Sequence, residues 1–116
     1  MQDFYNPITM DLTMVRGDSL AFNFELVGAD NITEISFTCK ENPADTEDIF
    51  TQSLTHGGIV LLSSVNGVNT YSVRVRPDQT SGLDPARYYY DLELQAGADV
   101  ITLMKGRLIV DWEVTY

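Results

Sequence analysis

Apolar and polar residues alternate along most of this chain, which is the pattern of β-strands with one buried face. The clearest run follows Gly17, where Leu20, Phe22, Phe24 and Leu26 alternate with Ser19, Asn23 and Glu25. Similar alternation predicts strands within residues 8–14, 35–40, 49–54, 58–63, 71–76, 88–94, 100–105 and 107–114. No long window has helical period, so the chain is predicted to be all-β.

The same alternation predicts which side chains are buried. Tyr89 falls on the polar face of its strand, with Arg87 and Asp91. The residues expected on the apolar faces include Ile8, Met10, Leu12, Met14, Ile35, Phe37, Cys39, Tyr88, Tyr90, Leu108, Val110, Trp112 and Val114.

Turn residues separate these runs. "THGG" is expected to close a hairpin between 49–54 and 58–63, and "NGVN" and "QAGAD" predict two further turns. Pro77 and Asp78 can open one helical turn that Gly82 closes. Short strands with turns roughly every ten positions favour an antiparallel immunoglobulin-like β-sandwich of about 7–9 strands. We expect a single domain, 1–116, in which residues 1–7 are either an N-terminal arm or a frayed terminus.

The composition narrows the functional classes. The chain has 7 Lys and Arg against 17 Asp and Glu, a formal charge of −10, which disfavours nucleic acids and anionic membranes as partners. Acidic residues concentrate in the first 48 positions. Cys39 is the only cysteine, so no intrachain disulfide is expected. The sequence has no signal-peptide pattern and no apolar run of membrane-spanning length, so we expect a soluble product.

Candidate catalytic groups are few. His56 is the only histidine and lies in a Gly-rich turn, while Cys39 falls on a buried face. We find no nucleophile elbow, phosphate-binding loop or zinc-ligand set, so the sequence predicts no enzyme, no cofactor and no small-molecule substrate. Four carboxylates, Glu41, Asp45, Glu47 and Asp48, crowd the loop around Pro43. They lack the spacing of a calcium loop, and a solvated loop is the preferred interpretation, although calcium stays an alternative.

The tetrapeptide Arg16-Gly17-Asp18-Ser19 resembles an integrin-binding motif. Integrin recognition needs Arg and Asp at the tip of an exposed loop, whereas here apolar-alternating runs flank the motif closely on both sides. We therefore interpret Arg16, Gly17 and Asp18 as turn architecture, in which Gly17 supplies permissive backbone geometry.

Five segments together resemble a family of small structural proteins of tailed phages and prophages. The similarity is to the N-terminal domain of the upper baseplate protein family, in which an R-G-D-[ST] turn feeds an alternating strand. An F-T-x-K-like strand, an R/P-x-D/E-x-T-x-x-L corner, a Y-x-Y-D strand and a closing strand ending in V-T follow. Here these elements correspond to Arg16–Phe24, Phe37–Lys40, Arg76–Leu83, Tyr88–Asp91 and Val110–Thr115.

The resemblance implies a non-enzymatic virion structural protein, made in the cytoplasm of the bacterial host, in a tail or baseplate assembly or adaptor role. A capsid (head) decoration protein of the same fold is an alternative, and a carbohydrate-binding module in host adsorption is another. The expected partners are other virion proteins and further copies of the chain, with no nucleic acid and no membrane. The residues that we predict at partner contacts are Phe4, Tyr5, Arg74, Arg76, Arg87 and Tyr89.

Overall fold

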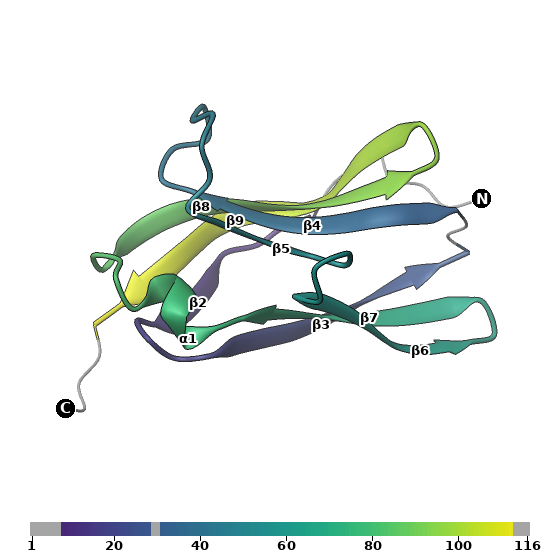
Figure 1. The fold of residues 1–116 in the computed structure, drawn as a ribbon, viewed down its shortest axis with the longest axis horizontal. Helices are drawn as coiled ribbons and strands as arrows, with labels where there is room; N and C mark the ends of the chain where they lie inside the picture. Colours follow the sequence, from purple (N-terminus) through teal and green to yellow (C-terminus); the bar gives the residue numbers. More distant parts are fainter. Residues whose placement is uncertain (1–7, 29–30, 113–116) are drawn as a thin grey trace.

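Two β-sheets pack face to face in the computed structural model, which describes residues 8–28 and 31–112 (Figure 1). The larger sheet contains β1 (Ile8–Thr9), β2 (Leu12–Val15), β4 (Ile32–Lys40), β5 (Phe50–Ser53), β8 (Ala86–Ala96) and β9 (Asp99–Asp111). The smaller sheet contains β3 (Leu20–Val27), β6 (Ile59–Val65) and β7 (Val68–Val75). One helical turn, α1 (Pro77–Thr80), joins β7 to β8.

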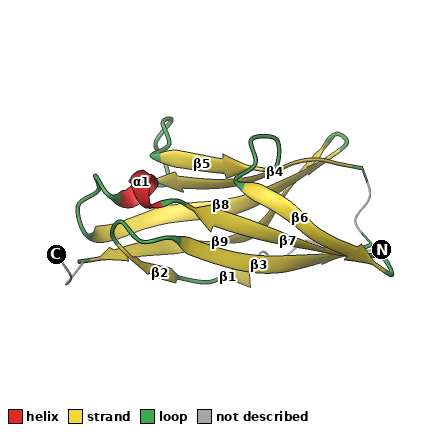
Figure 2. Ribbon diagram, turned by 60° about the horizontal axis from the view of Figure 1, so that its bottom comes forward, coloured by secondary structure: helices red, strands yellow, loops and turns green. Residues whose placement is uncertain are grey.

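The strand order is β1-β9-β8-β4-β5 in the larger sheet, with β2 also paired to β9, and β3-β7-β6 in the smaller one (Figure 2). β1 and β2 run parallel to β9, and the other pairs are antiparallel. Two facing sheets of this kind, with strands that are consecutive in the chain crossing between them, define the fold. It is an immunoglobulin-like β-sandwich. The predicted fold class is confirmed.

Aromatic residues fill the centre of the core. The ring of Phe37 on β4 stacks on Tyr90 of β8 at 5.1 Å between centroids and meets Phe22 of β3 edge-on at 5.8 Å. In antibody domains a tryptophan and an inter-sheet disulfide hold this region. Here the edge-on contact between Phe22 and Phe37 joins the two sheets, and Cys39, two residues after Phe37, is fully buried as predicted.

Tyr88 forms the corner that leads into β8. It is buried near the start of the strand, and its hydroxyl donates to the carbonyl oxygen of Asp84 at 2.6 Å. A tyrosine that bonds back to the chain a few residues upstream is a recurrent feature of this corner in immunoglobulin-like domains. Tyr90 is buried on the same face and Tyr89 lies on the opposite one, as the alternation predicts.

Three side chains expected in the core are exposed. Ile8 and Met10 are 61% and 48% exposed, because they lie at the edge of the larger sheet, beyond the reach of the three strands facing it. Trp112 is 67% exposed because β9 ends at Asp111 and the chain leaves the sheet there. Val114 is outside the described residues.

The predicted hairpin at "THGG" is wrong. β5 pairs with β4 in the larger sheet and β6 pairs with β7 in the smaller one, so this segment crosses between sheets. Gly57 does have a positive φ, of 84°. The carboxylate of Glu34 accepts a hydrogen bond from the Thr55 amide at 3.1 Å and so ties the crossing to β4. Burial acts to raise the pKa of the Glu34 carboxyl. The hydrogen bonds from Thr55 and from nearby amides have the larger combined effect, so the pKa lies below its ordinary value.

The other predicted turns are present. Asn66 and Gly67 both have positive φ values, 52° and 76°, at the β6–β7 hairpin, as a tight two-residue turn requires. α1 starts with Pro77 at its first position, and the side chain of Gln79 accepts a hydrogen bond from the Arg76 amide. Among the described residues, no helix is long and apolar enough to cross a membrane.

Candidate functional site

The Arg16–Ser19 turn packs against α1 and the segment that follows it. Gly17 has a φ of 81°, and its amide donates to the hydroxyl of the fully buried Thr80 at 3.1 Å. The guanidinium of Arg16 donates to the Leu83 carbonyl at 3.3 Å, and its carbon lies 5.3 Å from the centre of the Trp112 ring. The turn is therefore part of the framework.

The orientation of Arg16 and Asp18 is relevant to whether Arg16-Gly17-Asp18-Ser19 is an integrin-binding motif. Asp18 is exposed, but the Arg16 side chain points back along the molecule to Leu83 and Trp112. The Asp18 amide bonds to the Val15 carbonyl at 3.0 Å, which closes a tight turn. Arg and Asp are not displayed together at a loop tip, and the interpretation of Arg16, Gly17 and Asp18 as turn architecture agrees with these contacts.

The outer face of the larger sheet carries a hollow of about 480 Å³. The β4–β5 loop and the β8–β9 hairpin both rise from this side of the sheet (Figure 1). The lining residues come from β1, β4, β8, β9, the loop and the turn between β1 and β2: Thr9, Asp11, Thr38, Lys40, Pro43, Tyr89, Tyr90, Asp91, Thr102, Lys105, Gly106 and Arg107. This concave surface brings polar groups from separate strands together.

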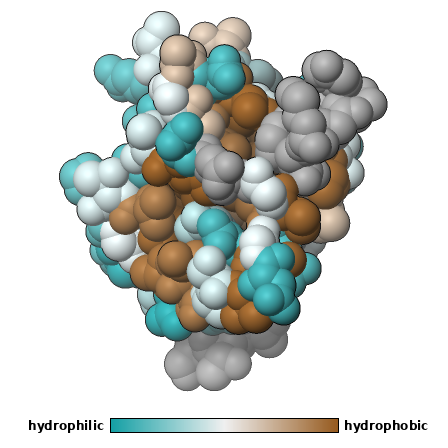
Figure 3. Space-filling view, turned by 90° about the vertical axis from the view of Figure 1, so that its right-hand side faces the viewer, coloured by the Kyte–Doolittle hydropathy of each residue, from teal (hydrophilic) through white to brown (hydrophobic). Residues whose placement is uncertain are grey.

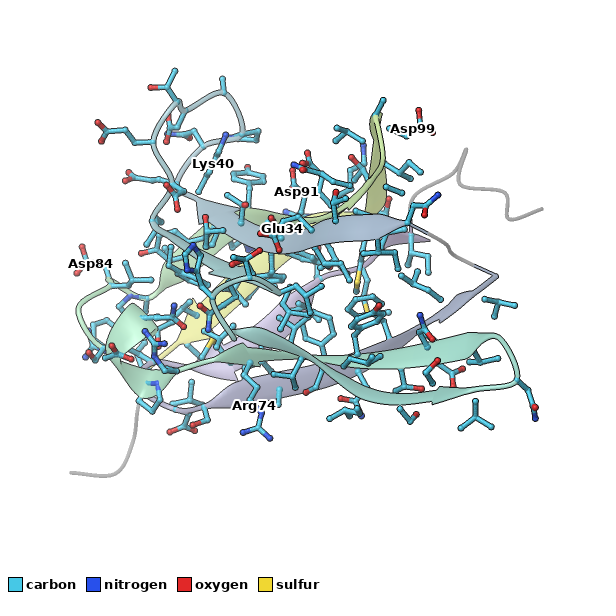
Figure 4. All side chains as sticks on the ribbon, turned by 45° about the vertical axis from the view of Figure 1, so that its right-hand side comes forward. Glu34, Lys40, Arg74, Asp84, Asp91 and Asp99 are labelled. Carbon is cyan, nitrogen blue, oxygen red and sulfur yellow. The ribbon has the colours of Figure 1, made fainter. Side chains whose placement is uncertain are left out.

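Strand register sets two rows of side chains across this hollow. In one row Asp91 on β8 lies between Thr38 on β4 and Lys105 on β9. In the other row, Tyr89 lies between Lys40 and Arg107. The outward positions of neighbouring strands thus place an aromatic ring and a carboxylate beside three basic groups. Figure 4 shows Lys40 and Asp91 on this same side of the sheet.

Several of these charges already have partners within the chain. Lys40 donates to the Asp45 carbonyl at 2.8 Å, and the Arg107 amide donates to the Asp11 carboxylate at 3.1 Å. The Arg107 side chain lies 3.7 Å from the same carboxylate. Burial raises the pKa of Asp91, while the nearby Lys40 charge acts in the opposite direction. The hollow is consequently a mixed-charge surface around the 37%-exposed ring of Tyr89.

The structure brings two of the predicted contact residues together. Arg87 is exposed on β8, two positions before Tyr89 and therefore on the same face. Arg74 lies on the opposite side of the sandwich, on the outer face of the smaller sheet (Figure 4). Arg76 precedes α1 and pairs with Asp78 at 3.1 Å on the surface. Phe4 and Tyr5 fall outside the described residues.

The candidate catalytic and metal residues do not converge in the described part of the chain. Burial, with a contribution from Asp48, raises the pKa of the Cys39 thiol to about 12, so it carries no thiolate near neutral pH. His56 is exposed in its turn. In the acidic loop, Asp45 accepts from the Asn42 amide and Asp48 from the Thr51 hydroxyl. Among the described residues, no group of three His, Cys, Asp or Glu side chains is arranged to hold a metal ion.

Sequence reasoning singled out Tyr89 and Arg87 but missed Lys40, Asp91 and Lys105 as their neighbours. The alternation does place Lys40 and Asp91 on polar faces, whereas in the run 100–105 it assigns no face to Lys105. What it lacks is the register, which alone decides that Lys40 lies opposite Tyr89 and Asp91 opposite Lys105.

No family model and no curated protein matches this chain. Among solved structures, a family 123 glycoside hydrolase from Clostridium perfringens is similar, with a TM-score of 0.54 and 11% identity over 94% of this chain. This chain covers 24% of that hydrolase chain, so the similarity concerns about a quarter of it. The similarity shows a shared fold alone.

Two immunoglobulin-type structures align over most of both chains. The first immunoglobulin domain of mouse SynCAM 2 has a TM-score of 0.41 and 21% identity, over 89% of this chain and 92% of that one. Murine CRIg has a TM-score of 0.42 and 12% identity, over 87% and 92%.

Proposed function

We propose that this chain is a non-enzymatic structural protein of a bacteriophage virion, with a tail or baseplate assembly or adaptor role. The proposal starts from the sequence resemblance to the upper baseplate protein family. It assigns the chain a mechanism of association rather than chemistry, through surfaces that a rigid sandwich holds in fixed positions.

The observation that carries the proposal is the contact between two of the resembling segments. The R-G-D-S turn and the R-P-D-Q-T-S-G-L corner are more than 60 residues apart in sequence, yet Gly17 bonds to Thr80 and Arg16 to Leu83. Segments that build one corner together have a physical reason to occur together. The presence of both segments in one chain therefore supports a framework shared with that family more strongly than five unrelated short sequence matches would.

The hollow around Tyr89 is the surface that we assign to a virion partner. Three of the seven Lys and Arg residues of this acidic chain line it. An exposed tyrosine supplies contact area with little loss of side-chain freedom, and the surrounding basic groups suit an acidic or polar segment of the partner.

The test is capture of partners from a lysate of phage particles by the tagged chain. We expect specific virion proteins to be retained, and retention to fall about tenfold or more in the Arg87→Ala, Tyr89→Ala double variant. Arg74→Ala is the matched comparison: Arg74 was also predicted at a partner contact, but it is exposed on the opposite side of the sandwich, so assigning the partner to the hollow excludes it from this contact. If no virion protein is retained, the proposal fails; if only Arg74→Ala loses retention, the surface assignment fails.

Particle location separates the tail role from the head alternative. Gold-labelled antibody against the chain should decorate the tail tip of virions in electron micrographs. Label over the capsid would instead establish the decoration-protein alternative, and unlabelled particles would contradict both.

A carbohydrate-binding role has one observation in its favour, namely the partly exposed Tyr89 ring beside Asp91 and Thr38 in the hollow. Sugars stack on aromatic rings and bond to such polar groups. This alternative predicts a glycan-array signal that Tyr89→Ala abolishes while the melting temperature stays unchanged. Absence of any glycan signal would remove it.

A further inference from the structure

β6 is an exposed edge of the smaller sheet. Among the described residues, no strand pairs with its outer side, while β7 covers the other (Figure 2). Leu61, Leu62 and Val65 are 50%, 52% and 61% exposed. Strand edges normally carry lysine, proline or charge that prevents pairing with another chain, and "IVLLSSV" has none of these.

The sequence of β6 and of the turns that flank it is equally free of charge. No Asp, Glu, Lys or Arg occurs between Ile49 and Val73, 25 consecutive residues of a chain in which 21% of residues are charged. The turns on both sides of β6 belong to this stretch. Two copies, each with a net charge of −10, repel one another over most of their surfaces. On β6 itself neither copy carries a charged side chain.

The backbone of β6 also has groups that point outward. The Arg74 amide bonds to the Gly58 carbonyl, so this pair is a hydrogen-bonded one. Pairs alternate along an antiparallel ladder, and Ile59 and Leu61 therefore direct their N–H and C=O groups away from β7. The register irregularity begins only after Leu61.

Leu61 faces the interior side of the sheet but lacks cover. Ile59, on the same face of β6, is fully buried, whereas half of Leu61 is exposed. The larger sheet ends near this position in the four-residue β5, which leaves the inner face of β6 open beyond Ile59. Figure 3, which views the end with the β6–β7 and β8–β9 hairpins, shows apolar residues at the surface there.

We propose that β6 pairs with β6 of a second copy, antiparallel and around a two-fold axis at Val60. Ile59 then lies opposite Leu61 of the partner, both exchange N–H···O=C bonds, and each Leu61 packs beside the partner's Ile59. The two three-stranded sheets become one continuous sheet. The contact is isologous and closes at two copies. It gives the assembly role proposed above a defined unit, and it can fail without affecting that role, because its test uses the purified chain alone.

Sedimentation equilibrium of the purified chain tests the pairing. We expect a concentration-dependent dimer, which Leu61→Lys weakens about tenfold or more, because an edge lysine is buried uncompensated in the paired sheet. Val27→Lys is the matched control, since Val27 is 53% exposed on β3 at the opposite edge of the same sheet. A monomer at every concentration, or an equal effect of both variants, would overturn the proposal; circular dichroism verifies that both variants fold.

Amide hydrogen exchange gives a residue-level readout that does not depend on a variant. The Ile59 and Leu61 amides should exchange fast in dilute solution and become protected as the concentration rises. A dimer in which these two amides stay unprotected would show that another surface joins the copies.

Discussion

Gly106 shows how one residue fixes the edge of the larger sheet. The carbonyl of Met10, between β1 and β2, points toward Gly106 on β9. It accepts a hydrogen bond from the hydroxyl of Tyr90 on β8 at 2.6 Å. A Cβ atom at Gly106 would overlap this carbonyl oxygen. The absence of a side chain at Gly106 is thus what lets the first strand lie against β9.

Gly106→Ala should destabilise the domain for this steric reason. We expect a loss of about 1–3 kcal/mol, or several degrees in melting temperature. Gly82→Ala is the control, since a Cβ there meets nothing within 4 Å. Thermal unfolding of both variants checks this prediction; equal melting temperatures would contradict it.

Cys39 predicts how stability depends on alkaline pH. Burial raises the pKa of its thiol from 9.0 to about 12. Above pH 9 the unfolded chain loses this proton while the folded chain keeps it, so the unfolding free energy falls as the pH rises from 9 toward 12. Tyr90, whose pKa burial and Asp11 raise to about 12, contributes in the upper part of this window.

The Cys39→Ala variant separates the two contributions. Its unfolding free energy should fall less steeply than that of the wild type above pH 9, by up to about 1.4 kcal/mol per pH unit. Denaturant unfolding at a series of pH values measures both slopes. Parallel slopes would show that the thiol titrates alike in both states.

At the residue scale, alternation correctly predicted the buried Cys39 and the opposite faces of Tyr89 and Tyr90. It failed at Ile8, where the pattern continues but no facing sheet covers the strand, and at Trp112, where the pattern continues but β9 has already ended at Asp111. Alternation reports which side of a strand is apolar. Whether another sheet covers that side depends on the width of both sheets, which no local pattern contains.

At the scale of elements, the corner between the Gly17 turn and α1 connects distant parts of the chain. Thr80 is fully buried and its hydroxyl is the acceptor for the Gly17 amide. Thr80→Val keeps the shape but leaves that amide without this acceptor, so we expect a loss of about 1–3 kcal/mol. Ser81→Ala, at an exposed neighbour, should be nearly neutral. Unfolding curves that coincide for both variants would contradict a structural role for this bond.

The crossing from β5 to β6 shows where element prediction stops. The glycines of "THGG" look like a hairpin signal, and Gly57 does adopt a positive φ. The chain uses that freedom to change sheets, because β5 finds its partner in β4 and β6 finds its own in β7. The Asn66-Gly67 hairpin was predictable because the two strands that this turn connects, β6 and β7, pair directly with each other.

At the scale of the whole molecule, charge divides the surface into two kinds of contact. The hollow around Tyr89 combines Lys40, Lys105 and Arg107 with two carboxylates. The β6 edge lies within a stretch without any charged side chain. The sequence predicted the strands that form both surfaces and the net charge around them. It could not place either surface, because each depends on which strands become neighbours or edges.

These two contacts should respond to salt in opposite ways. Raising the salt from about 0.05 M to about 0.5 M shortens the range of charge interactions severalfold. A partner held in the hollow by basic groups should then bind more weakly, whereas pairing through β6 should strengthen, because only the repulsion between two −10 chains is screened. Partner capture and sedimentation equilibrium at both salt concentrations measure the two responses. Dimers that dissociate in high salt would show that the copies meet through charged surfaces, away from β6.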